Sequence, residues 1–254
     1  MKLRLLAALA AAAVLALTAR AEEPAIIAKA RAYLGSEKAL TGVRTIHFIG
    51  RVAQRPAGQE GALSRDAGNR IDYYFENPWR ERIAVSGGGA TVETALDDFD
   101  GWQRSTPAAG RGPPRLVLLG SSVTENLRAD TWENLNFYRG LEAAGGTVED
   151  EGLVSVGGIA CEKVVFTHSP SSIYRRYFDL STGRLVFTET AAGVIITEKG
   201  EIISGGIRFP AAIETRQPTG NGGAQVTLYT FDRVIVNETL PDSLFTVPLA
   251  TAAP

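Results

Sequence analysis

The sequences GGIRFPAAIETRQ at residues 205–217 and QVTLYTFDRVIVNETL at residues 225–240 decide the fold class of this chain. In both, apolar and polar side chains alternate, which is the pattern of a strand with one buried face. A polar, glycine-containing segment separates the two, so we expect a last pair of antiparallel strands. The sequence PDSLFTVP at residues 241–248 then predicts a tail that folds back onto this pair.

The same alternation recurs through most of the chain. It places Phe48 on one face of a predicted strand at residues 45–53, and Tyr73 and Phe75 on one face of a strand at residues 70–77. Similar runs follow, separated by turn sequences such as Gly-Gly and Ser-Thr-Gly. Many short strands joined by tight turns indicate an antiparallel sheet, and their number implies strong curvature or partial closure into a barrel.

Two segments depart from this pattern. Residues 24–34 start with a proline, end before a glycine and carry apolar side chains at helical spacing, which predicts an amphipathic helix. Residues 123–144 contain no strand pattern and predict one or two short helices, with Asp130 or Thr131 as a cap. Strands thus outnumber helices, and the predicted fold class is mainly β, with a smaller helical part (α+β). The helices can cover the open side of the curved sheet.

The amino-terminal segment predicts export. Two basic residues precede an uninterrupted apolar run at residues 5–17, and Ala-Arg-Ala then gives a small-x-small cleavage site. We expect a signal peptide over residues 1–21 and a soluble, single-domain mature chain over residues 22–254. The only cysteine, Cys161, lies far from the cleavage point, so we expect no lipid-modified amino terminus and no internal disulfide.

The charge balance bears on the class of partner. The chain has 26 Lys and Arg against 28 Asp and Glu, a formal net charge of −2. A protein that binds nucleic acid needs a basic face to replace the counterions of the phosphates. We therefore expect no nucleic-acid partner.

Four motifs in a fixed order carry a family resemblance. They are FDGWQRS at residues 99–105, YFDLSTGRLVF at 177–187, GGIRFPAAIETR at 205–216 and FDRVIVNETLPDSLFTVP at 231–248. With a helix before them and a helical interruption between the first two, they resemble the LolA/LolB-like superfamily of periplasmic outer-membrane lipoprotein carriers. The resemblance spans nearly the whole mature chain.

The resemblance implies both a fold and a function. The fold is a strongly curved antiparallel sheet, an unclosed barrel covered by the amino-terminal helix and a short mid-chain helical lid. Its apolar concave face would accept acyl chains of lipoproteins or another lipid-like ligand. A monomer in the bacterial periplasm, with membrane-associated donor and acceptor proteins, is the corresponding expectation. Arg51, Arg80 and Arg82 are candidates for the arginine with which such carriers latch the lid.

Large apolar side chains on the inward face of the strands and of the mid-chain helix form the candidate ligand-binding set. We expect this set to be Phe48, Tyr73, Phe75, Ile83, Trp102, Trp132 and Phe137. The same alternation also fits a fully packed core without a cavity. The scaffold would then be a periplasmic protein-interaction or sensor module.

One basic stretch lies within a predicted strand. In Tyr174-Arg175-Arg176-Tyr177, successive side chains point to opposite faces. This pattern fits an ordinary solvated strand, or an outward basic spot that faces anionic head groups.

The sequence offers no arrangement typical of catalysis or metal binding. His47 and His168 lie on separate predicted strands, without cysteine pairs or acidic clusters at ligand spacing, and no G-x-S-x-G motif occurs. We therefore expect no enzymatic activity, no metal and no cofactor.

Overall fold

The computed structural model describes residues 23–248, except residues 60, 65, 67 and 221. The predicted signal peptide at residues 1–21 lies outside these residues. The helices are α1 (Ala25–Leu34), α2 (Glu37–Thr41) and α3 (Ser121–Leu135), with the short 3-10 helices η1 (Leu141–Ala144) and η2 (Asp242–Leu244). The strands are β1 (Thr45–Arg55), β2 (Asn69–Glu76), β3 (Arg80–Gly87), β4 (Ala90–Asp97), β5 (Asp100–Thr106), β6 (Arg115–Leu118), β7 (Thr147–Val156), β8 (Ile159–Ser169), β9 (Ser172–Asp179), β10 (Leu185–Thr190), β11 (Ile195–Lys199), β12 (Ile202–Ser204), β13 (Ile207–Phe209), β14 (Ala212–Pro218) and β15 (Ala224–Val236).

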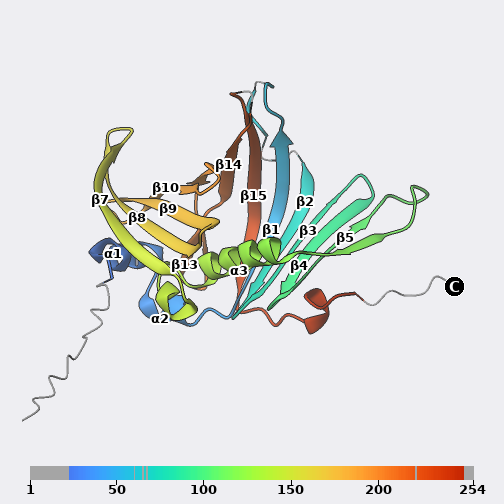
Figure 1. The fold of residues 1–254 in the computed structure, drawn as a ribbon, viewed down its shortest axis with the longest axis horizontal. Helices are drawn as coiled ribbons and strands as arrows, with labels where there is room; N and C mark the ends of the chain where they lie inside the picture. Colours follow the sequence, from blue (N-terminus) through green and yellow to red (C-terminus); the bar gives the residue numbers. More distant parts are fainter. Residues whose placement is uncertain (1–22, 60, 65, 67, 221, 249–254) are drawn as a thin grey trace, which may run out of the picture.

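Thirteen of the strands form one sheet in the order β6-β5-β4-β3-β2-β1-β15-β14-β11-β10-β9-β8-β7. The first and last strands of the chain, β1 and β15, pair antiparallel near its centre and join the two arms of the sheet. Strands β6 and β7 are the two edges, and among the described residues they do not pair with each other. Figure 1 shows the two arms on either side of α3. The predicted unclosed antiparallel barrel is confirmed.

A bulge in the central pair contributes to the curvature. The register between β1 and β15 shifts at Ile49 and Gly50, so that Ile49 pairs with Arg233 and Gly50 with Phe231. A side chain at Gly50 would place its Cβ 1.9 Å from the carbonyl oxygen of Thr230. Only glycine allows this close approach, and a bulge of this kind increases the local twist and bends the strand.

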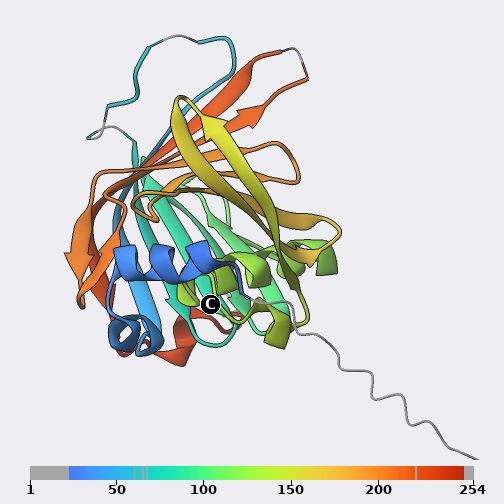
Figure 2. The ribbon, with the colours of Figure 1, turned by 90° about the vertical axis from the view of Figure 1, so that its left-hand side faces the viewer.

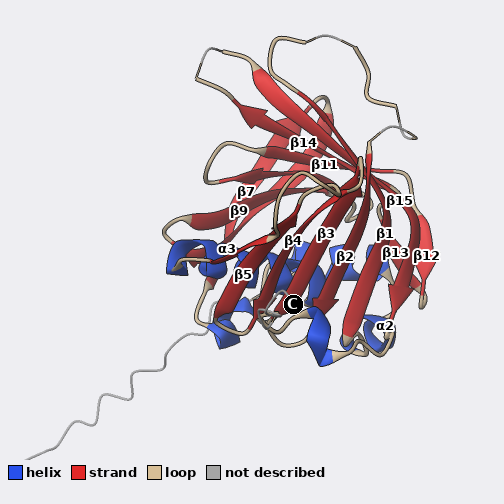
Figure 3. Cartoon of the chain, turned by 90° about the vertical axis from the view of Figure 1, so that its right-hand side faces the viewer, coloured by secondary structure: helices blue, strands red, loops and turns tan. Residues whose placement is uncertain are grey.

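Helices cover the concave face of the sheet. The helix α3 packs on β2, β3, β4, β5 and β9, and therefore bridges the two arms. In Figure 2, α1 lies across the sheet below the β7–β8 hairpin, and Figure 3 shows the helices gathered toward one end of the strands. The apolar core forms two clusters on this side, one around Ile27, Trp132 and Phe166 and the other around Phe48 and Phe75.

The structure confirms the predicted amino-terminal helix and changes the mid-chain prediction. Asp130 and Thr131 are not caps, because α3 begins after Gly120 and both residues lie in its last two turns. Residues typical of caps occur there for another reason, since their side chains bind polar groups on the sheet. The short polar side chains that favour a helix start also serve as inward-facing hydrogen-bonding groups.

Candidate functional site

A cavity of about 260 Å³ lies between α3 and the concave face of the sheet. Strands from both arms contribute to its wall, and the residues after α3 close part of it. Aromatic side chains dominate the lining: Phe48, Tyr73, Phe75, Phe137, Tyr138, Tyr174, Phe209, Tyr229 and Phe231. A concave, mostly apolar space with a few polar groups is typical of a small-molecule site.

The aromatic part of the wall centres on Phe48. Its ring lies 4.8 Å from that of Phe231 and meets the rings of Phe209 and Phe75 edge-on at 5.7 and 6.2 Å. Offset and edge-to-face contacts of this kind hold large rings in fixed positions. This side of the cavity is therefore a rigid apolar surface.

Four of the seven predicted ligand-binding residues line the cavity: Phe48, Tyr73, Phe75 and Phe137. Ile83 pairs with Tyr73 and shares its face of the sheet, but it is half-buried outside the lining. Trp132 lies on the buried side of α3, packed against Phe166 and His168 in the neighbouring core cluster.

Trp102 does not line the concave face. It pairs with Ala95, which pairs with Arg82, and the side chains of directly opposed residues point to the same side of a sheet. Arg82 in turn is adjacent to Glu81, whose side chain faces α3, so Trp102 lies on the convex face. There its indole Nε1 donates to the carbonyl of Phe245 at 2.6 Å. The carboxyl-terminal tail, which contains Phe245, lies against the convex face and covers this tryptophan.

A cluster of acids lies at one part of the cavity wall. The hydroxyl of Tyr73 lies 2.8 Å from Glu81 Oε1 and also contacts Asp130, while Thr131 donates to Glu81 Oε2 at 3.1 Å. Burial raises the pKa of Glu81 well above its usual value and also raises the pKa of Asp130. The negative charge of Asp130 further raises the pKa of Glu81, and that of Glu133 further raises the pKa of Asp130. A phenol has one hydrogen to donate, so its contact with two carboxyl groups is satisfied best when one of them is protonated.

A second polar cluster connects α3 to β8 and β9. The carboxylate of Glu133 lies 2.7 Å from His168 Nε2 and 2.5 Å from Arg176 Nη2. Arg176 is only 7% exposed, and its guanidinium lies beside the ring of Tyr138. Neither alternative for residues 174–177, a solvated strand or an outward basic spot, holds for Arg176, because the register of β9 directs this arginine toward the cavity.

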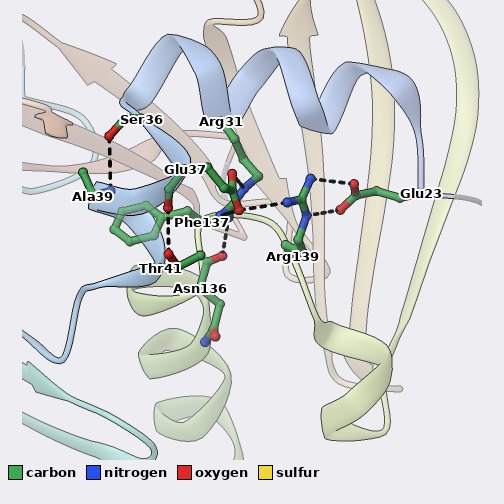
Figure 4. Close-up of polar contacts among 9 residues, drawn as sticks. All are labelled: Glu23, Arg31, Ser36, Glu37, Ala39, Thr41, Asn136, Phe137 and Arg139. Atoms are coloured by element: carbon green, nitrogen blue, oxygen red, sulfur yellow. Dashed lines mark hydrogen bonds and ion pairs between the residues drawn. The ribbon is translucent and has the colours of Figure 1, made fainter.

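Arg31 fixes the carboxyl-terminal end of α3. Its Nη1 donates to the carbonyls of Asn136 and Phe137 at 3.0 and 2.7 Å, while Nε and Nη2 bind the carboxylate of Glu37 (Figure 4). Arg139 also binds Glu37 at 2.9 Å. The last carbonyls of a helix lack partners within the helix, and a buried cation that binds them stabilises this end.

Two non-glycine residues beyond α3 adopt left-handed backbone conformations. Phe137 has φ 48° and Tyr138 has φ 72°, and both side chains line the cavity. Such conformations are strained for residues with a Cβ and persist where surrounding contacts fix them. The bond from Arg31 to the carbonyl of Phe137 is one of these contacts.

None of the arginines proposed from the sequence holds α3. Arg80 binds Glu76, Asp97 and Asp242, and Arg82 binds Glu93 on the convex face, while Arg51 is exposed. The sequence did contain a signal for Arg31. It lies four residues after Ile27 on α1 and therefore on the buried stripe of that helix, where an unpaired charge would be costly.

Within residues 23–248, apart from the four gaps, no group of three or more His, Cys, Asp or Glu side chains is arranged to hold a metal ion. No helix among these residues is long and apolar enough to cross a membrane.

No protein-family model and no curated protein matches the chain by sequence. Among solved structures, a DUF1329 family protein from Desulfovibrio piger is similar with a TM-score of 0.55 and 11% identity, over 88% of this chain and 97% of that chain. A LolA superfamily protein from Nitrosomonas europaea is similar with a TM-score of 0.54 and 13% identity, over 89% of this chain and 97% of that chain. The chain therefore has the fold of the LolA superfamily, an unclosed antiparallel barrel with a helix across its concave face.

Proposed function

We propose that this protein is an exported carrier that binds an acyl chain, of a lipoprotein or of another lipid, in the cavity under α3. The observation that carries the proposal is the aromatic-lined cavity of about 260 Å³ on the concave face of a LolA-type sheet. An interior filled by side chains would favour the alternative of a protein-interaction module. The open space beside Phe48 and Phe231 favours a ligand instead.

The free energy of uptake comes from removing hydrocarbon from water. Each methylene group that enters the apolar part of the cavity contributes about 0.8 kcal/mol. Reversible uptake of this kind requires no catalytic group, so the proposal is binding without chemical conversion. The predicted signal peptide agrees with a carrier that moves through the periplasm.

Loading requires α3 or its carboxyl-terminal segment to move. The cavity is slightly smaller than the roughly 300 to 1,000 Å³ of sites that enclose drug-sized ligands. A long acyl chain would therefore displace Phe137 and Tyr138, whose positions depend on the Arg31 contacts. In this proposal Arg31 is the latch of the lid, and its hydrogen bonds break as the ligand enters.

Titration of the purified mature protein with a fluorescent fatty-acyl probe tests the proposal. Saturable binding, reversed by an unlabelled acyl compound, is the expected result. The absence of saturable binding in protein first freed of co-purified lipid, across a range of pH and salt, would refute the carrier proposal and favour the interaction module.

A further inference from the structure

Arg176 is a charged side chain buried at the cavity without a full set of partners. It pairs across the sheet with Val164 and Thr188, which places it on the concave face of β9. It is 7% exposed and lines the cavity. Taking a guanidinium out of water is costly unless its N–H groups find acceptors.

Two nitrogens of this guanidinium have no acceptor among the residues that the structure describes. Nη2 lies 2.5 Å from the carboxylate of Glu133, whereas Nε and Nη1 are buried and make no hydrogen bond within the described part of the chain. The rings of Tyr138 and Phe166 lie 4.7 and 5.2 Å from the guanidinium carbon and attract the cation, but they do not replace acceptors for its in-plane N–H groups. Buried donors without partners are rare in folded proteins, so these two call for an acceptor from outside the chain.

A second polar group of the same wall also lacks a hydrogen-bond partner among the described residues. Glu198 lies on β11 and lines the cavity. Burial raises its pKa, although the positive charges of Arg176 and Arg184 oppose this rise. The shift favours the neutral carboxyl form, which has an O–H group to donate.

The polar and aromatic parts of the wall lie on different strands. Arg176 on β9 and Phe48 on β1 are separated in the sheet by β10, β11, β14 and β15. A ligand that satisfies both parts needs a polar head at one end and hydrocarbon at the other.

Building on the proposed carrier function, we infer that the cavity recognises the carboxylate of a free fatty acid, with Arg176 as the residue that binds the head group. The carboxylate accepts a hydrogen bond from one of the two unpaired nitrogens of Arg176, Nε or Nη1, which point to different sides of the guanidinium. The neutral carboxyl of Glu198 donates to it. The hydrocarbon chain extends toward Phe48, Phe209 and Phe231.

The charges of the lining favour a single negative charge on the ligand. The acids Asp130, Glu133 and Glu198 face the two cations Arg176 and Arg208, and Arg208 is already paired with Glu201. Arg176 is likewise paired with Glu133, so a dianionic phosphate head would bring two negative charges that no free cation of the lining balances. A carboxylate brings only one, and Arg176 still has N–H groups to donate to it.

Competitive displacement of a fluorescent acyl probe separates the head group from the chain. A medium-chain fatty acid, its methyl ester and its primary alcohol share the same hydrocarbon and differ only at the head. We expect the acid to bind the wild-type protein about tenfold to a hundredfold more tightly than the ester, the difference that hydrogen bonds to a charged group supply. Equal affinities of acid and ester would overturn the inference and leave the carrier function standing, whereas binding of none of the three would refute the carrier function itself.

Arg176→Met removes the donors and keeps the length of the side chain. It is expected to lower the affinity for the acid to that for the ester, while the ester binds as before. Arg175→Met is the matched control, because Arg175 is the neighbour on β9 whose side chain points to the opposite face. A preference for the acid that survives in Arg176→Met would overturn the inference.

A measurement on the wild-type protein decides the question if Arg176→Met does not fold. The ¹³C NMR signal of a carboxyl-labelled fatty acid is followed as a function of pH when the acid is bound. A carboxylate beside a guanidinium titrates at lower pH than the same acid in a lipid vesicle. A bound carboxyl that titrates as it does in the vesicle would contradict the role of Arg176.

Discussion

The guanidinium of Arg31 on α1 donates to the carbonyl of Phe137 at a distance of 2.7 Å, across 106 residues of sequence. This bond joins the amino-terminal helix to the point where the covering helix α3 ends. It also fixes a residue whose backbone is left-handed and whose ring lines the cavity. The stability of the closed cavity is thereby linked to one buried arginine.

Replacing Arg31 with methionine should loosen this closure. The carbonyls of Asn136 and Phe137 lose their buried donor, so we expect the free energy of unfolding to fall by about 2 to 4 kcal/mol. Amide hydrogen exchange at residues 136–139 should accelerate more than exchange in the central strands. Arg139→Met is the control, because its partly exposed ion pairs contribute at most about 1 kcal/mol. Unchanged exchange at residues 136–139 in Arg31→Met would contradict the latch.

Replacing Glu81 with glutamine should change how stability depends on pH. Burial and the neighbouring Asp130 raise the pKa of Glu81 above 4.5, so the folded state keeps a proton that the unfolded state releases. Wild-type stability therefore falls as pH rises above 4.5 until the folded-state carboxyl ionises. The amide oxygen of Glu81→Gln still accepts from Tyr73, and its NH2 group donates to Thr131 Oγ1, whose hydrogen is then donated to the carbonyl of Leu127. The amide carries no charge.

The groups that face this carboxyl are Tyr73 from β2 and Asp130 and Thr131 from α3, with Glu133 and Arg176 acting on Asp130. We expect the melting temperature of Glu81→Gln to exceed that of the wild type by a margin that widens from about pH 5 to about pH 8. Thermal melts of both proteins across this range provide the measurement. A margin that is constant or narrows with pH would show that Glu81 is not held in its neutral form.

Filling the cavity should block uptake without unfolding the protein. Thr215 lines the cavity on β14, and Thr215→Phe directs a larger apolar side chain into this space. We expect binding of the acyl probe to weaken by at least about tenfold, and the melting temperature to stay the same or rise because the new side chain fills a cavity. The control is Thr197→Phe on β11, because Thr197 lies between the cavity residues Ile196 and Glu198 and points to the other face. Full probe binding by Thr215→Phe would place the ligand elsewhere.

Trp102 provides the complementary test on the convex face. Trp102→Phe keeps a large ring and removes the hydrogen bond from Nε1 to the carbonyl of Phe245. We expect a loss of about 1 to 2 kcal/mol in the free energy of unfolding and unchanged affinity for the probe. Denaturant unfolding and probe titration measure the two quantities. A weaker probe affinity at unchanged stability would show that Trp102 contributes to the ligand site.

The architecture was predictable because it depends on local patterns. Period-two alternation around Phe48, Tyr73 and Phe75 predicted strands whose inward residues now line one cavity. The helix at residues 24–34 followed equally from its spacing of apolar residues. The order of the motifs then indicated the superfamily fold, which the structural comparison confirms.

The remaining features depend on contacts between residues distant in sequence. Alternation divides the side chains of a strand between two faces but does not say which face is concave, and Trp102 was assigned to the wrong one for that reason. The burial of Arg176 follows from the registry of β8, β9 and β10, and its ion pair with Glu133 depends on where α3 crosses the sheet. Helical spacing places Arg31 on the buried stripe of α1, but its partners, the carbonyls of Asn136 and Phe137, follow only from the tertiary structure.

Native mass spectrometry of the freshly purified mature protein tests the central claim most directly. The carrier account predicts a bound species with the mass of a fatty acid or an acylated lipid, which disappears on delipidation and returns when fatty acid is added. Protein that shows only the mass of the polypeptide, before delipidation and after incubation with fatty acid, would contradict the account.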